Sequence, residues 1–183
     1  GYYAYTKYKG EELIKKYSKK FNFKYAILRY FNVAGASRSG KIGEIENSHG
    51  HLIKNIAIQL LKKKPQINIF GKDYPTKDGT CIRDYIHVSD LSEIHIKVLN
   101  YLKYKKKSLI LNCGYGKGYS VLEIVKICRG MYKNLNITFI QKRKGDVAEV
   151  YSDVKKIKKL LNWKPKFNNL KKIIISAINW EKK

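Results

Sequence analysis

Hydrophobic and polar positions along this chain follow two different periods, and the alternation between them predicts helices and short strands. Apolar side chains at helical spacing predict helices over residues 5–20, 51–63, 90–104, 153–161 and 170–180. Short apolar or alternating runs predict strands over residues 25–31, 66–70, 81–87, 109–113 and 137–140. Because strands and helices take turns along the chain, the pattern predicts an α/β fold.

The same pattern predicts how some of these elements pack. Residues 25–31 are almost wholly apolar, which is typical of a buried strand. Ser120 and Glu123 have the spacing of a capping box, so a helix should begin directly after the glycine-rich turn 114–118. Apolar stripes predict the buried faces of two helices: Leu13, Ile14 and Tyr17 on the first, and Leu91, Ile94, Val98, Leu99 and Leu102 on the third.

The length and composition of the chain indicate a globular protein. It has 183 residues, of which 44% are hydrophobic, enough for the core of one domain or one lobe of a larger protein. No uninterrupted apolar run approaches the ~18 residues of a membrane-spanning helix. The chain opens with Gly1-Tyr2-Tyr3 and no initiator methionine, so we expect an upstream region to be missing.

The formal net charge of +25 raises the question of nucleic-acid binding. The 39 basic residues are mostly lysine and are spread along the whole chain. Proteins that read phosphates and bases tend to use arginine, whose planar guanidinium binds bidentately. Abundant Ile, Asn and Tyr beside scarce Ala and Pro are typical of an AT-rich genome, which we favour as the cause of the charge. A nonenzymatic remnant that binds polyanions remains an alternative.

The cysteines and histidines give little sign of a metal or a disulfide. Cys81, Cys113 and Cys128 are odd in number and far apart, which favours reduced thiols and a cytoplasmic protein. His49 and His51 lie two residues apart in a predicted loop and are weak support for a metal site. We therefore predict no bound metal.

Tyr3 and Lys7 form the first candidate for catalysis. Their spacing of four residues places both side chains on one face of a helix. A phenol ionises near pH ~10 and is a poor base at neutral pH. A nearby ammonium group favours the phenolate, so the pair is suited to accept a proton. The spacing alone is a weak signal in a chain so rich in Tyr and Lys.

Longer motifs surround this pair. Residues 28–36 read LRYFNVAGA, and residues 69–91 read IFGKDYPTKDGTCIRDYIHVSDL. With the YxxxK pair they resemble the UDP-glucose 4-epimerases, which belong to the extended branch of the short-chain dehydrogenase/reductase family. Further matching segments begin at Asn112, Arg143 and Leu161, so the resemblance covers essentially the whole chain. It corresponds to the carboxyl-terminal half of the family's sequence.

The resemblance implies a fold and a division into domains. The fold would be the C-terminal part of a Rossmann-like, doubly wound sheet together with a smaller α/β substrate-binding lobe. Residues 1–35 would end the NAD-binding Rossmann domain with its active-site helix and the following strand. Residues 36–183 would form mainly the sugar-nucleotide-binding lobe, with segments near 80–112 returning to the Rossmann sheet.

The resemblance also implies a reaction and its residues. The Tyr3 phenolate would remove the proton of the sugar 4-hydroxyl while bound NAD oxidises that carbon, and the keto sugar would turn and be reduced on its other face. Lys7 and Tyr30 would join Tyr3 in holding NAD. Phe70 would stack on uracil, Arg83 and Arg143 would neutralise the diphosphate, and Asp146 would accept from a ribose hydroxyl. The remaining implied substrate-binding residues are Phe31, Asn32, His51, Leu52, Asn68, Tyr85 and Val150.

Val150 falls where the family varies in bulk beside the sugar. A small residue there accompanies acceptance of N-acetylated sugars, so the resemblance implies activity on UDP-N-acetylglucosamine as well as on UDP-glucose and UDP-galactose. The neighbouring families of sugar-nucleotide dehydratases, decarboxylases and reductases keep YxxxK and remain alternatives. The sequence of residues 78–88 favours the epimerases over these neighbouring families.

The family's glycine-rich GxxGxxG turn for NAD is not found in these 183 residues. The turn at Gly114–Gly118 does not replace it, because the ribose-binding acid expected ~20 residues on is not there. We therefore expect this chain alone to bind NAD poorly and to turn over little or no substrate. A full-length protein would form a homodimer through helices that include residues 5–20, as is usual in the family.

Overall fold

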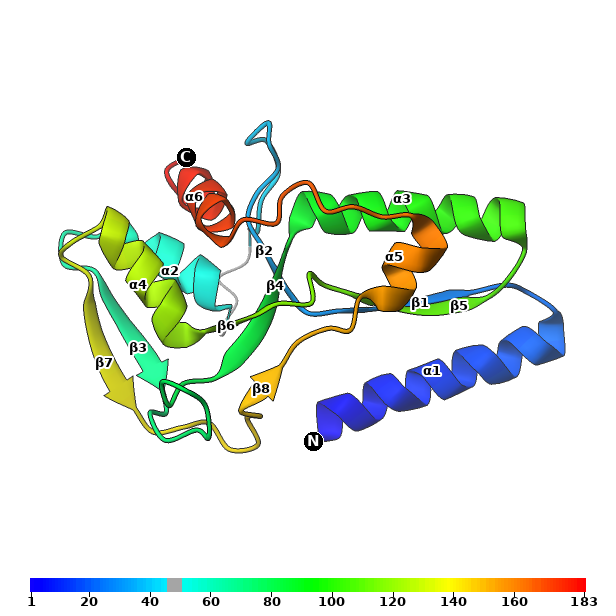
Figure 1. Ribbon diagram of the computed structural model, residues 1–183, viewed down its shortest axis with the longest axis horizontal. Coiled ribbons are helices and arrows are strands. Elements are labelled where there is room, and N and C mark those ends of the chain that lie inside the picture. Colours follow the sequence, from blue (N-terminus) through cyan, green and yellow to red (C-terminus); the bar gives the residue numbers. More distant parts are fainter. Residues whose placement is uncertain (46–50) are drawn as a thin grey trace.

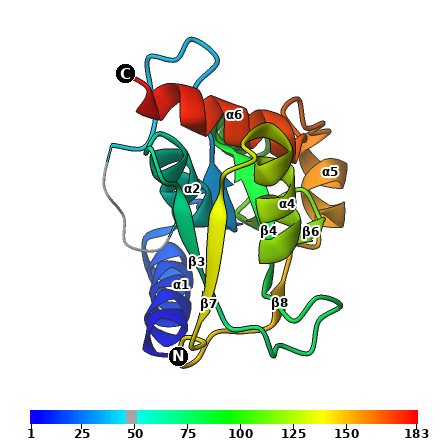
Figure 2. The same ribbon diagram turned by 90° about the vertical axis from the view of Figure 1, so that its left-hand side faces the viewer.

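The structure is a computed structural model that describes residues 1–45 and 51–183, and these residues form two regions (Figure 1). One region, at the right of Figure 1, consists of a two-stranded sheet with helices α1, α3 and α5 around it. The other gathers helices α2, α4 and α6 around a second two-stranded sheet, which faces the viewer in Figure 2. Strand β4 crosses the middle of the molecule and connects the two regions.

The helices follow the predicted pattern closely. Each of the five predicted helices is present, and the capping box of Ser120 and Glu123 opens another. Helix α1 begins three residues before the predicted start, which places Tyr3 inside its first turn. The helices are α1 (Tyr2–Phe21), α2 (Leu52–Leu60), α3 (Val88–Lys105), α4 (Val121–Met131), α5 (Lys155–Leu161) and α6 (Leu170–Glu181).

The strands form parallel pairs in both regions. Strand β1 pairs with β5 in one region, and β3 pairs with β7 in the other. Strand β4 has parallel partners in β2 and β8 and an antiparallel partner in β6. The strands are β1 (Ala26–Tyr30), β2 (Asn32–Ala34), β3 (Gln66–Phe70), β4 (Ile82–His87), β5 (Leu109–Cys113), β6 (Gly118–Ser120), β7 (Asn136–Ile140) and β8 (Glu149–Val150).

Buried apolar side chains from both regions make one connected core. Helices α2, α4 and α6 contribute side chains that are wholly enclosed, including Ile56, Ile124 and Ile174. Trp163, which follows α5, is also enclosed and stacks against Tyr115 with their ring centroids 6.3 Å apart. Removing such surfaces from water is the main driving force for folding.

Two buried aspartates tie the loops to this core. Asp84, on β4, accepts hydrogen bonds from the backbone amides of Tyr115, Gly116 and Ser152. Asp90, in the first turn of α3, accepts from the Tyr115 hydroxyl at 2.6 Å and from two backbone amides that follow Trp163. Neither side chain is exposed. Because buried charges need such donors, these contacts hold the glycine-rich turn in place.

Several packing predictions were wrong. The stripe of Leu13, Ile14 and Tyr17 on α1 is exposed, and α1 buries none of its residues. Strand β1 buries only Ile27, because β5 is its single partner. Leu99, predicted to lie on the buried stripe of α3, is also exposed. Within residues 1–45 and 51–183, these faces lack the packing partners that the apolar pattern anticipates.

Three strands were not predicted from the sequence. Strands β2, β6 and β8 contain only two or three residues each. A period of two cannot be recognised in so short a run. Within the described residues, none of the helices combines the length and apolar character that a membrane crossing requires.

Candidate functional site

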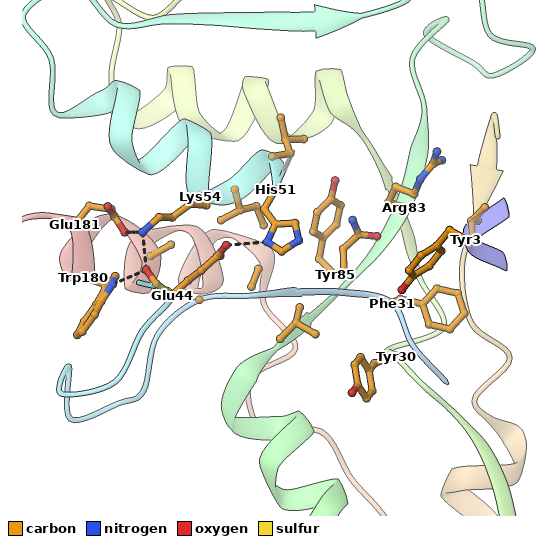
Figure 3. A pocket seen from close by; sticks show the side chains of 18 residues that line it. Tyr3, Tyr30, Phe31, Glu44, His51, Lys54, Arg83, Tyr85, Trp180 and Glu181 are labelled. Carbon is orange, nitrogen blue, oxygen red and sulfur yellow. Dashed lines mark hydrogen bonds and ion pairs between the residues drawn. The ribbon is translucent and has the colours of Figure 1, made fainter. Parts of the chain in front are cut away.

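A cavity of about 510 Å³ lies where β1 ends, beside β2 and the start of α2 (Figure 3). Tyr3, Phe31, Arg83 and Tyr85 gather at one end of it in Figure 3. At the other end of the view, Glu44, Lys54, Trp180 and Glu181 form a polar cluster. We call this space the first cavity.

A second cavity of about 460 Å³ continues from the first. Asn32, Leu52, Arg83 and Tyr85 line both, so the two form one groove along β4. Its far end is bordered by four of the predicted substrate residues and by Cys81. The side chains found only in this second cavity include Asn68, Phe70, Cys81, Arg143 and Asp146.

The groove therefore brings the predicted site residues together with one exception. Tyr3, Tyr30, Phe31, His51 and Val150 line the first cavity. Lys7 lines neither, although it stands behind Tyr3 on α1 with its Nζ 5.4 Å from the centre of the Tyr3 ring. The groove itself does not determine the roles of these side chains.

Helix α1 presents Tyr3 at the open side of the first cavity, where 76% of the residue is exposed. An ion pair anchors the helix to strand β1. The Arg29 guanidinium donates from Nε and Nη2 to both carboxylate oxygens of Glu11, at 2.6 and 2.5 Å. Hydrogen bonding from Arg29 is the main reason why the pKa of the Glu11 carboxyl is lowered. Both side chains are therefore charged at neutral pH.

Phe70 and Arg143 face each other at the far end of the second cavity. The guanidinium carbon of Arg143 lies 3.8 Å from the centre of the Phe70 ring, which is the geometry of a cation–π contact. Phe70 is half-buried at the end of β3, whereas Arg143 is exposed after β7. The guanidinium covers one face of the Phe70 ring, so a planar group that stacks on this face would displace it, with the guanidinium then free to meet an adjacent anion.

Arg83 lies between the two cavities. Its Nη2 donates to Asp146 Oδ1 at 2.9 Å, and its Nη1 donates to the backbone oxygen of Ile82 at 2.8 Å. The Asp146 carboxylate thus pairs with one of the two arginines predicted to meet a diphosphate. Arg83 and Arg143 place two guanidinium groups along one groove, which suits a dianion.

Tyr85 differs from Tyr3 in its surroundings. Tyr85 is 3% exposed on the floor of both cavities, and burial raises the pKa of its phenol. Its hydroxyl therefore stays protonated at neutral pH and can donate a hydrogen bond, but it is unsuited to act as a base. Tyr3 is the exposed phenol of the groove that lies on a helix with a lysine one turn later.

The polar cluster at the closed end of the first cavity was missed by the sequence reasoning. Lys54 is 6% exposed, and its Nζ donates to Glu181 Oε1 and to the Glu44 carbonyl, both at 2.5 Å. Trp180 Nε1 also donates to the Glu44 carbonyl, at 3.0 Å. The only sequence signal was a lysine inside the apolar run of α2, which anticipates a buried partner.

His51 is the N-cap residue of α2, but its side chain does not cap the helix. Its Nδ1 lies 2.8 Å from Glu44 Oε1 instead. The first amides of α2 are therefore left to interact with groups in the groove, where the helix dipole favours negative charge.

The described residues contain no group of three or more His, Cys, Asp and Glu side chains that could hold a metal ion. His49, considered with His51 as a weak metal candidate, lies outside the described residues. All three cysteines are unbonded and buried. Burial raises the pKa of both Cys113 and Cys128 to about 12, so these two thiols are unreactive near neutral pH.

The open side of the first cavity is where an NAD nicotinamide ring would lie. Tyr3 and Tyr30 stand there with most of their surface exposed, in contact with space that no other part of the described chain fills. Phe31 lies beside Tyr3 at the same end of the cavity, as Figure 3 shows. Aromatic side chains around an open edge suit one face of a planar nicotinamide ring, so the residues present fit the group on this side.

Comparisons with known proteins agree with this geometry. The sequence profile of the NAD dependent epimerase/dehydratase family matches residues 1–114. The UDP-glucose 4-epimerase of Azospirillum brasilense is 40% identical over 181 residues, which cover 98% of this chain and 52% of that protein. UDP-arabinose 4-epimerase 1 of Arabidopsis thaliana is 40% identical over 185 residues, covering 98% of this chain and 44% of that protein.

Solved structures show the same similarity. A crystal structure of UDP-glucose-4-epimerase from Stenotrophomonas maltophila, with bound NAD and formylated UDP-arabinopyranose, superposes with a TM-score of 0.91 at 33% identity. The match covers 98% of this chain and 54% of that one. This chain spans about half the length of the curated relatives it matches.

Proposed function

Because this chain belongs to the NAD dependent epimerase/dehydratase family, we propose that it carries the catalytic tyrosine and the sugar-nucleotide site of a UDP-glucose 4-epimerase. One observation carries the proposal. A single groove joins the exposed phenol of Tyr3 to the Phe70 ring and to the guanidinium groups of Arg83 and Arg143. In a UDP-sugar the sugar, the diphosphate and the uridine follow one another, which matches the order of Tyr3, Arg83 and Phe70 along the groove.

The division of the chain follows from this proposal. Residues 1–35 end an NAD-binding Rossmann domain, and residues 36–183 form mainly the sugar-nucleotide lobe. The pairing of β1 with β5 supports the return of a later segment, near residues 80–112, to the Rossmann sheet. Because relatives are about twice as long, the proposed reaction is that of an assembled enzyme that also contains a glycine-rich NAD-binding part.

In the proposed reaction Tyr3 exchanges a proton with the sugar 4-hydroxyl. Bound NAD supplies the reversible oxidation of the same carbon. Lys7, one turn along α1, stabilises the negative charge on the Tyr3 oxygen. Phe70 stacks on uracil. Asn68 and Asp146 bind the uridine, with Asp146 accepting from a ribose hydroxyl. Because Arg83 and Arg143 hold the diphosphate, the sugar can turn about it and offer either face to Tyr3.

The amides at the start of α2, at His51 and Leu52, complete the diphosphate site from the opposite wall. Phe31, Asn32 and Tyr85 form the surface on which the sugar rests. Tyr85 donates to a sugar oxygen because its burial keeps it protonated. Tyr30 contributes to the NAD side of the cavity.

Turnover of three UDP-sugars tests the proposal. With NAD, UDP-galactose should be converted to UDP-glucose by the assembled enzyme, and little or not at all by this chain alone. UDP-N-acetylglucosamine and UDP-arabinose should be tested beside it, because a UDP-arabinose 4-epimerase is equally similar in sequence. A dehydrated or decarboxylated product would assign the chain to another reaction of the family.

Replacing Phe70 with alanine should weaken UDP binding. Loss of one base-stacking ring costs about 1–3 kcal/mol, or roughly 5- to 100-fold in Kd. Isothermal titration calorimetry of UDP into this chain measures the change without NAD. Phe139→Ala is the matched control, because Phe139 lies on the neighbouring strand β7 and borders neither cavity. Equal effects of the two substitutions would contradict the uracil assignment.

Replacing Val150 with tyrosine should make the enzyme more selective. Val150 borders the first cavity and lies opposite Arg83 in the pairing of β8 with β4. A bulky ring there should lower turnover of UDP-N-acetylglucosamine roughly 5- to 150-fold, the effect of about 1–3 kcal/mol of steric overlap. Turnover of UDP-glucose should change little. Val147→Tyr, at an exposed position outside the cavity, is the control.

We also propose that the assembled enzyme is a cytoplasmic homodimer that pairs through α1. The exposed apolar and aromatic side chains of this helix support the pairing, since a face of this kind is usually covered. Sedimentation of the assembled enzyme should give twice the monomer mass. The buried, unbonded thiols are compatible with a reducing compartment.

A further inference from the structure

A third cavity lies on the other side of α6 from most of the groove and has its own chemistry. Its volume is about 730 Å³. The loop 36–40, the segment 165–169 and one face of α6 surround it. Of the residues that the structure describes, it shares Trp180 alone with the first cavity and none with the second.

The charge of this third cavity is one-sided. Among residues 1–45 and 51–183, four cationic residues line it, namely Arg38, Lys166, Lys172 and Lys183, and no aspartate or glutamate does. The first cavity has Glu44 and Glu181 in its wall, and the second has Asp146. A basic chain alone does not explain the difference, because all of these cavities lie in the same protein.

Two of the four cations are uncommitted. Lys166 pairs with Glu93 at 2.8 Å, and the Lys183 ammonium donates to the carbonyl of Gly40. Within residues 1–45 and 51–183, the side chains of Arg38 and Lys172 have no hydrogen bond or ion pair. A guanidinium and an ammonium therefore border the same space without a counter-charge.

Other polar groups of the third cavity also suit an anion. Ser37, Ser39, Asn168 and Asn179 line it and can donate hydrogen bonds. The N-terminal end of α6, capped by Asn169, is at the same place, so the helix dipole adds to the positive potential. Positive charge, hydrogen-bond donors and a helix N-terminus therefore lie together at this cavity and would all stabilise a bound anion.

The remaining wall is apolar and aromatic. Phe167 stacks on the buried His87 ring with their centroids 4.6 Å apart, and both rings border the cavity. Pro165 and Ile175 extend this wall. Burial lowers the pKa of His87, although the carboxylate of Asp90 partly offsets it, so the imidazole is neutral at pH 7. This wall suits an uncharged ring.

We propose that the third cavity is a second ligand site, which binds an organic phosphate monoester carrying a ring. Arg38 and Lys172 hold the phosphate, and the ring lies against the wall of Phe167. The site is separate from the proposed sugar-nucleotide groove. Trp180 borders both the first and the third cavity and donates to the Glu44 carbonyl. A ligand in one cavity would therefore affect binding in the other through this side chain.

The test is a titration of the full chain with phenyl phosphate, inorganic phosphate and benzoate, followed by ¹H–¹⁵N NMR. Phenyl phosphate should shift the amides of residues 37–40 and 168–172 saturably, with a Kd of about 1 mM or lower. Inorganic phosphate should bind the same amides roughly tenfold more weakly, because it leaves the apolar wall uncovered. Benzoate, which has the ring but a single charge, should bind more weakly than phenyl phosphate.

Matched substitutions separate this site from general attraction to a basic protein. Lys172→Gln and Arg38→Gln should each weaken phenyl phosphate binding roughly tenfold. Lys171→Gln and Lys41→Gln remove the same charge from exposed neighbours that do not line the cavity. They should change the Kd of phenyl phosphate less than twofold. Shifts confined to residues around Arg83 and Arg143, equal effects of all four substitutions, or benzoate binding as tightly as phenyl phosphate would overturn the proposal.

Discussion

Replacing Tyr3 with phenylalanine should lower the kcat of epimerisation about 100- to 10,000-fold while leaving UDP binding unchanged. The size of the effect is that of removing a positioned general base. The substitution removes one oxygen atom at the open side of the first cavity. The packing of the described chain does not depend on this atom, because α1 buries none of its side chains. Phe70, Arg83 and Arg143, which we assign to the nucleotide, belong to other elements.

The same helix supplies controls for this experiment. Tyr2 and Tyr5 lie in the same turn of α1, are exposed, and border neither cavity. Their phenylalanine variants should keep the kcat of the parent enzyme. UDP affinity, measured by calorimetry, should be equal in all three variants. Substantial turnover by Tyr3→Phe, or an equal loss in Tyr2→Phe, would show that Tyr3 is not the base.

Part of the groove could be predicted because several of its residues lie in one long motif, residues 69–91. Phe70 and Arg83 both belong to that motif, and β3 and β4 appear where the pattern predicts them. The family profile confirms the resemblance on which their assignment depends. The α/β fold class is also confirmed, and the likeness to solved epimerases supports it.

The closed end of the first cavity could not be predicted in the same way. The partners of Lys54 are Glu181 and the carbonyl of Glu44, and Glu181 lies 127 positions away. No local pattern specifies so distant a pair, because the contact arises only when α6 packs on α2. The third cavity is similar, since it is assembled from the loop 36–40 and the end of the chain.

Hydrophobic pattern also failed where a partner surface is lacking within the described chain. Leu13 and Tyr17 on α1 have the spacing of a buried stripe, yet both are exposed. The pattern indicates that a face is suited to burial, but it does not identify what covers it. For the same reason, strand β1 carries an apolar sequence although only one of its edges is paired.

Replacing Asp84 with asparagine should destabilise the fold by about 3 kcal/mol and lower Tm by roughly 10 °C, with no change in overall shape. The Asp84 carboxylate is wholly buried, and its oxygens accept from the amides of Tyr115, Gly116 and Ser152 at 3.0–3.2 Å. The Ser152 hydroxyl donates to Oδ2 as well, at 2.5 Å. In the asparagine variant, an NH₂ group would replace one carboxylate oxygen. It would face backbone amides that also donate, so those hydrogen bonds would be lost.

The glycine-rich turn approaches the Asp84 side chain closely at Gly114. A Cβ atom added at Gly114 would lie 2.4 Å from Asp84 Oδ2, so the glycine-rich turn is shaped around this carboxylate. Thermal unfolding followed by circular dichroism measures the loss, and Asp73→Asn is the control. Asp73 is exposed and pairs with Lys142, a contact that solvent screens, so its variant should melt close to the parent. If Asp84→Asn also melted within about 2 °C of the parent, the turn would be held by packing rather than by charge.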